Sequence, residues 1–389
     1  MLSLYRPVLD LPGAKPLLGW SLLSRTVSIP QGAIVLIAAY GATGSWLWAS
    51  VAASINTGCA ALSAWIMGQL MDRFPVRKIL LITSPGALML LPLGLVEAGV
   101  TVTCLIALTA GLMRPAGGTA LRTVWTSLCS DQQSRAAAFS MEASIVPIAG
   151  ALGAAGAGLV AETWGASQVA IPAAIIGFLA TLGLALCRAV KQAPVPQRKA
   201  GQQIKVPLGA ATWAAILAVA ASWFALSAAE VGVGSARGAG QLGYLTGLSM
   251  LAVVLGAHLY ASRGGTGQPL KWITGGLAAS AFSLLLLSGS VQWLLPAACL
   301  MFALGAGRGV LSPSVSSSIA QWAPSARQSE AMGLYGTAVL VGQTASRPLA
   351  GLLAHNLGPG WPILMAAVAS ALVAVIVWRQ ARGQNREVR

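Results

Sequence analysis

Long apolar segments separated by short polar breaks make up most of the chain. A helix needs about 20 apolar residues to cross the hydrocarbon core of a bilayer. The apolar residues do not alternate with polar ones, as they would in the strands of a transmembrane barrel. We therefore predict twelve membrane-spanning helices, at about residues 17–39, 45–71, 79–98, 101–124, 136–161, 166–188, 208–232, 240–261, 270–289, 292–318, 329–354 and 360–379.

One longer polar break, "RAVKQAPVPQRKAGQQIKVP", divides this pattern into two sets of six. It holds five bases, three prolines and no acid, a composition typical of a linker. The predicted organisation is a six-helix bundle at 1–188, a cytoplasmic linker at 189–207 and a second six-helix bundle at 208–389. The sets also resemble each other, since "AGLVAETWG" at 157–165 is matched by "AGLLAHNLG" at 350–358. Repeated six-span halves are known among transporters, with the substrate site at the repeat interface.

Composition agrees with a polytopic membrane protein. Only 8% of residues are charged and the mean hydropathy is +0.75, whereas a soluble domain carries about 25% charged residues. The net charge of +15 would suggest nucleic acid in a soluble protein. Here the bases lie mostly at the ends of apolar segments, so we expect no nucleic-acid partner. The five cysteines are single and widely spaced, which indicates buried thiols and no metal site.

The distribution of bases predicts the orientation. Of the 24 lysines and arginines, eighteen fall in segments on one side of the twelve spans, and only Arg237 falls in a loop on the other side. Loops rich in Lys and Arg stay in the cytoplasm. Both termini are therefore expected to be cytoplasmic.

The break after the second span, "GQLMDRFPVRKILL", carries a recognisable charge pattern. Its Gly68, Leu70, Asp72, Arg73, Arg77 and Leu80 match the loop signature G-x-L-x-D-R-x-G-R-R/K-x-x-L, while Pro75 and Val76 depart from it. In this the chain resembles the major facilitator superfamily of the bacterial twelve-span type. The resemblance implies an all-α fold of two six-helix bundles and secondary transport by alternating access. It also implies a monomer in the bacterial cytoplasmic membrane.

A cluster of charges on the cytoplasmic side is expected to act as a latch between the halves. Asp72 ends a helix, where the negative end of the helix dipole disfavours an acid. The resemblance implies that its positive partner is the N-terminus of span eleven, near Ser329. The alternative is a plain positive-inside anchor, which does not explain Asp72. The predicted latch residues are Gly68, Asp72, Arg73, Arg77, Arg122, Asp131 and Arg135.

Ionisable residues inside the spans mark candidate sites, because they are costly in a membrane. The resemblance implies that spans one, four, seven and ten line a central cavity. For Arg347, the carbonyl freed by Pro348 is an expected hydrogen-bond acceptor, and Trp223 is a candidate for stacking on a ligand. Structural pairing of the arginines with acids such as Glu142 is the alternative reading. The predicted cavity residues are Arg25, Arg114, Trp223, Arg308 and Arg347.

Four deep arginines face two deep acids, Glu142 and Glu230, and this excess of positive charge favours an anionic substrate. An arginine does not release its proton, so Glu142 and Glu230 are the predicted proton carriers. The driving force would be the proton gradient, with no cofactor. HExxH, GxSxG and a phosphate loop are absent from the sequence, so no enzyme is expected. The favoured function is proton-coupled efflux of a small organic molecule, as in many bacterial members of the family. The alternatives are uptake of an organic anion by symport and, in another class, a receptor or lipid scramblase without coupled transport.

Overall fold

The computed structural model describes residues 8, 11–71, 73–96, 99–115, 117–129, 132–193, 209–263, 269–322 and 328–387. Within these ranges every regular element is helical. The first half contains α2 (Ala14–Ser28), α3 (Gln31–Thr43), α4 (Trp46–Met71), α5 (Val76–Thr83), η1 (Ser84–Leu90), α6 (Pro92–Leu95), α7 (Val100–Leu112), α8 (Gly117–Leu128), α9 (Gln132–Thr163), η2 (Ser167–Val169), α10 (Ala170–Leu186) and α11 (Arg188–Gln192). The second half contains α12 (Ala210–Arg237), α13 (Ala239–Ser262), α14 (Pro269–Ser290), α15 (Leu294–Trp322), α16 (Gln328–Leu357) and α17 (Gly360–Glu387).

Helices occupy all twelve segments in which a span was predicted. Among the described residues, nine helical segments are long and apolar enough to cross a membrane, and the bent pair α2–α3 makes a tenth. The other two predicted segments do not meet these criteria of length and apolarity. α7 has only 13 residues, and α16 has 30 residues but includes polar ones such as Gln343 and Arg347. The multi-pass architecture is thus confirmed.

Two predicted spans are broken, so the expectation of a continuous helix at 17–39 and at 101–124 was wrong. α2 and α3 meet at an angle of 46°, and Pro30 is the residue before α3. Proline lacks an N–H and disfavours the helical conformation of the residue before it. Pro115 lies in the same way between α7 and α8. Such breaks expose backbone carbonyl groups at membrane depth, where a side chain must satisfy them.

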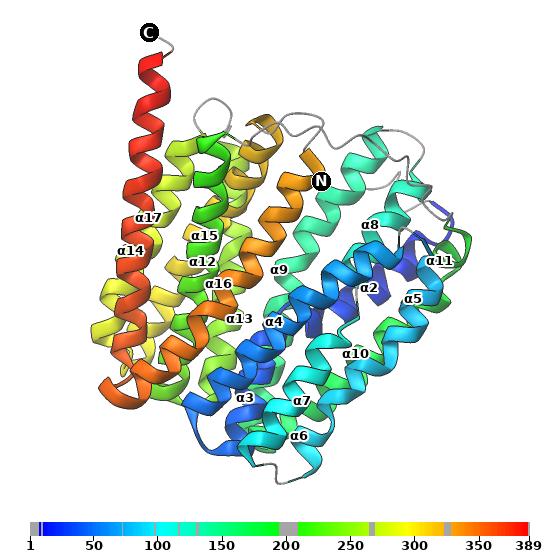
Figure 1. Cartoon of the computed structure of the whole chain (residues 1–389), viewed down its shortest axis with the longest axis horizontal. Coiled ribbons are helices and arrows are strands. Elements are labelled where there is room, and N and C mark those ends of the chain that lie inside the picture. Colours follow the sequence, from blue (N-terminus) through cyan, green and yellow to red (C-terminus); the bar gives the residue numbers. More distant parts are fainter. Residues whose placement is uncertain are drawn as a thin grey trace.

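The two halves meet along two helix pairs, α4 with α16 and α9 with α13. Glycine allows the close approach, since a Cβ placed on Gly158 of α9 would lie 2.5 Å from the carbonyl oxygen of Gly240. In Figure 1 the helices of the two halves lean apart towards the end that carries the C-terminus. We call the opposite end, where α3 leads into α4 and α12 into α13, the distal end.

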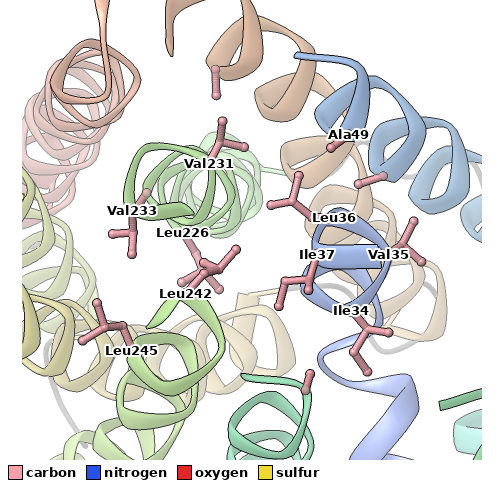
Figure 2. Packing of buried hydrophobic residues seen from close by; sticks show 14 of the residues in the cluster. Ile34, Val35, Leu36, Ile37, Ala49, Leu226, Val231, Val233, Leu242 and Leu245 are labelled. Carbon is pink, nitrogen blue, oxygen red and sulfur yellow. The ribbon is translucent and has the colours of Figure 1, made fainter. Parts of the chain in front are cut away.

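A hydrophobic core joins the halves near the distal end. It contains buried side chains of α3 and α4 together with those of α12 and α13. Figure 2 shows Leu36 and Ile37 projecting from α3 towards Leu226 of α12 and Leu242 of α13. Glu230 of α12 lies within this apolar frame, between the buried Ala229 and Val231.

Candidate functional site

An ion pair links α12 and α16 inside the bundle. The Nη2 atom of Arg347 lies 3.4 Å from the Oε2 atom of Glu230, and their side chains are only 2% and 5% exposed. Charge-assisted N–H···O hydrogen bonds usually measure about 2.7–2.9 Å. The pair is therefore loose, and it leaves Arg347 able to bind other acceptors.

The Arg347 side chain reaches from the second half into the first. Its Nη1 atom donates to the hydroxyl of Thr57 on α4 at 2.6 Å. Its guanidinium rests against Gly32 of α3, where an added Cβ would lie 2.8 Å from Cζ. Arg347 thus contacts both halves.

Pro348 does not act as expected. A proline removes the hydrogen bond to the carbonyl four residues earlier, which is that of Thr344. This carbonyl accepts a hydrogen bond from the hydroxyl of Ser54 on α4 at 2.7 Å, whereas Arg347 donates to Thr57 and Glu230. The expectation that Arg347 would satisfy this freed carbonyl was therefore wrong.

Arg308 of α15 forms a second buried cation. It is 5% exposed, and its guanidinium carbon lies 4.3 Å from the centroid of the Trp223 ring. Its Nε atom donates to the hydroxyl of Ser222 at 3.4 Å. Its Nη1 atom has no hydrogen-bond partner among the residues that the structure describes. Trp223 therefore stacks on a protein cation, which presents the guanidinium on an aromatic face.

Trp223 and Glu230 bring the two cations to one face of α12. They are seven residues apart in a helix, and this spacing puts them on the same side. The charge of Arg308 also interacts with that of Glu230. The Glu230 carboxylate thus pairs with Arg347 and interacts electrostatically with Arg308.

Arg114 lies at the break between α7 and α8. Its Nη2 atom donates to the carbonyl of Ser28, at the end of α2, so the two broken spans meet at this residue. A small, mostly apolar cavity of about 30 Å³ lies beside it, and its lining includes the polar side chains of Ser24, Gln31 and Thr181. The positive charges of Arg114 and Arg347 interact, which adds to the positive potential near Glu230.

The other predicted residues are placed less fully. Arg25 is half-buried on α2, and Glu142 belongs to α9, although its side chain is outside the described part. Of the predicted latch, Arg73 and Arg77 are exposed, and Asp72 and Asp131 lie outside the described residues. Only the backbone is described for Gly68, Arg122 and Arg135, all of them helical. The latch therefore remains a prediction.

Several site residues carry no signal in the sequence. Thr57 and Ser222 are hydroxyl residues within apolar helices, where many others bond only to their own backbone. Gly32 is one of 45 glycines. Their role follows from contacts between helices far apart in sequence, and only the structure reveals these contacts.

The fold and the buried charges define a class, an all-helical membrane protein with charged side chains inside the bundle. Residues 212–388 match the Major Facilitator Superfamily. The whole chain has the fold of solved transporters. One is a mutant of the peptide transporter POT in complex with alafosfalin, with a TM-score of 0.74, 16% identity and coverage of 97% of this chain and 95% of that one.

Two further structures agree. The POT family transporter PepTSo has a TM-score of 0.68 and 13% identity, and the match covers 96% of this chain and 98% of that one. A POT family transporter in complex with 5-aminolevulinic acid has a TM-score of 0.72 and 12% identity, with 95% and 96% covered. No curated protein matches the chain in sequence. The family match covers residues 212–388, less than half of the chain, and the structural matches show that the chain has the fold of these transporters.

Proposed function

We propose that the chain is a proton-coupled symporter of a small organic anion, with Glu230 as the proton carrier and Arg347 as the group that binds the anion. It would act as a monomer in the bacterial cytoplasmic membrane with both termini inside. The single observation that carries this proposal is the buried Glu230–Arg347 ion pair, whose arginine also contacts the other half.

Competition for Arg347 supplies the coupling. While Glu230 is ionised, its carboxylate holds the guanidinium. When Glu230 takes up a proton, the ion pair loses its negative partner, and a buried unpaired guanidinium is strongly unfavourable. A carboxylate on the substrate can then replace that of Glu230. Proton and anion therefore favour each other's binding, and they cross together when the halves rock.

This sense of coupling favours symport over the efflux that the sequence favoured. Antiport requires proton and substrate to exclude each other, as a cationic substrate and a proton would at Glu230. An anion at Arg347 and a proton on Glu230 instead favour each other's binding. The side chain of Glu142, the other predicted proton carrier, lies outside the described part of the chain, and Glu230 is proposed because its carboxylate pairs with Arg347.

Transport into proteoliposomes tests the proposal. A thermal-shift screen of small organic acids, beginning with 5-aminolevulinic acid, would select a substrate. An imposed pH gradient, acid outside, should then drive its accumulation in the wild-type chain. Glu230→Gln should abolish accumulation above equilibrium yet allow exchange of labelled for unlabelled substrate. Glu162→Gln, at an exposed carboxylate of the distal end, is the matched control. Full pH-driven accumulation in Glu230→Gln would refute the assignment.

A further inference from the structure

We infer that the substrate of this chain carries two negative charges, and that Arg308, held on Trp223, binds the second of them. This inference rests on the proposed function, in which Arg347 binds the first. It names the substrate class as short organic dianions such as dicarboxylates.

Arg308 has the geometry of a prepared anion subsite. Its guanidinium carbon lies over the ring of Trp223, 4.3 Å from the centroid, and its Nε atom donates to the Ser222 hydroxyl at 3.4 Å. Nη1 remains without a hydrogen-bond partner among the described residues, although the side chain is 95% buried. A buried charged donor without an acceptor is costly. A planar guanidinium with a free nitrogen is suited to bind a carboxylate oxygen.

The charges around Glu230 indicate how much negative charge the site can take. Arg308 and Arg347 both interact with the Glu230 carboxylate. Once Glu230 is protonated, these two guanidinium groups share no carboxylate among the side chains that the structure describes. A monoanion would neutralise one of them, whereas a dianion neutralises both. Because uncompensated charge in a site of low dielectric constant is strongly unfavourable, the dianion is favoured.

The spacing sets the length of the substrate. On α12, Trp223 contacts Arg308 and Glu230 pairs with Arg347. The seven residues of helix from Trp223 to Glu230 rise about 10 Å. Because both guanidinium groups interact with the one Glu230 carboxylate, the two anionic groups must be closer than this. A chain of four or five carbons between and including the carboxylates meets the requirement.

Isothermal titration of the purified full-length chain near neutral pH tests the subsite with succinate and butyrate, which have the same chain length and differ by one carboxylate. Wild type should bind succinate more tightly. A hydrogen bond to a charged group contributes about 1.5–3 kcal/mol, so Arg308→Gln should weaken succinate binding about 10- to 100-fold. Butyrate, bound at Arg347 alone, should bind with nearly unchanged affinity.

Three further variants make the outcome specific. Arg308→Lys keeps the charge without the planar fork and should recover part of the succinate preference, provided its melting temperature equals that of wild type. Trp223→Leu removes the platform and should also reduce the preference. Arg237→Gln changes a distal arginine that bonds to Gln241 and Gln292, and it should leave both affinities unchanged.

Two results would overturn the inference: equal binding of succinate and butyrate by wild type, or equal weakening of both by Arg308→Gln. The proposed function fails separately, through pH-driven accumulation that persists in Glu230→Gln. If the chain prefers succinate through Arg308 but accumulates no substrate in response to a pH gradient, the subsite stands and the proposed coupling does not.

Discussion

The guanidinium of Arg347 on α16 lies 3.4 Å from the carboxylate of Glu230 on α12, and both side chains are almost completely buried. A buried ion pair adds little net stability compared with apolar residues, because desolvation of the two charges offsets their attraction. The presence of this ion pair in the bundle is better explained by a role as a charge-dependent switch than by a contribution to stability.

This view predicts how the free energy of unfolding responds to substitution. Glu230→Ala leaves Arg347 buried without its acid and should destabilise the chain by about 3–5 kcal/mol. The double variant Glu230→Leu with Arg347→Met removes both charges and should recover most of that loss. Reversible denaturant unfolding in detergent measures the difference. A double variant less stable than either single variant would show that the pair is mainly structural.

Thr57 is predicted to position Arg347 for the anion. Thr57→Val removes the hydroxyl that accepts from Nη1 at 2.6 Å but keeps the shape of the side chain. The guanidinium then loses its hydrogen bond to the first half, and substrate affinity should fall about tenfold, in line with about 1.5 kcal/mol for a hydrogen bond to a charged group. Thr57→Ser keeps the hydroxyl and should bind as wild type does. Equal affinities of Thr57→Val and Thr57→Ser would contradict this role.

Gly32 provides a test that alters no charge. A Cβ at this position would overlap the guanidinium of Arg347, so Gly32→Ala should displace the ion pair and reduce pH-driven accumulation. Alanine favours a helix over glycine by about 1 kcal/mol, so a loss of helical structure would not explain the effect. The control is Gly19→Ala, since no atom lies within 4 Å of a Cβ there. Normal accumulation by Gly32→Ala would mean that the guanidinium can move without consequence.

The sequence predicts the helical segments well because length and apolarity determine them. Pro30 and Pro115 are visible in the sequence, but whether a proline bends or breaks a span depends on what satisfies the freed backbone, as the bond from Arg114 to Ser28 does. Arg308 and Trp223 were identified singly, because a charge or a large aromatic stands out in an apolar segment. Their stacking on each other could not be identified from the sequence, since it joins α12 to α15 across 85 residues of chain.

The partners of Arg347 were beyond sequence reasoning for the same reason. Thr57 is 290 residues away and Glu230 is 117 residues away, and no periodic pattern connects such positions. A charge imbalance can be counted from the sequence, whereas a pairing requires the packing of the helices. The predicted latch around Asp72 likewise depends on contacts between helices far apart in the sequence. The substitution Asp72→Ala would test it.

The final prediction concerns closure of the distal end. α9 and α13 approach so closely that a Cβ on Gly243 would lie 2.5 Å from the Cα of Gly158. Gly243→Leu would force the helices apart, and it should shift the population towards states open at the distal end. Overpacked contacts typically cost about 1–3 kcal/mol, which is enough to reverse a conformational preference of a few kcal/mol or less.

A buried reporter can measure this shift. Ser50 on α4 is fully buried beside Gly351 of α16. In a chain without the five native cysteines, Ser50→Cys should react slowly with a water-soluble maleimide and several-fold faster when Gly243→Leu is added. Gly156→Leu is the matched control, because a Cβ at Gly156 of α9 meets no atom within 4 Å. If labelling rates are the same with Gly243→Leu and Gly156→Leu, the α9–α13 contact does not hold the distal end closed, and the α4–α16 contact must do so alone.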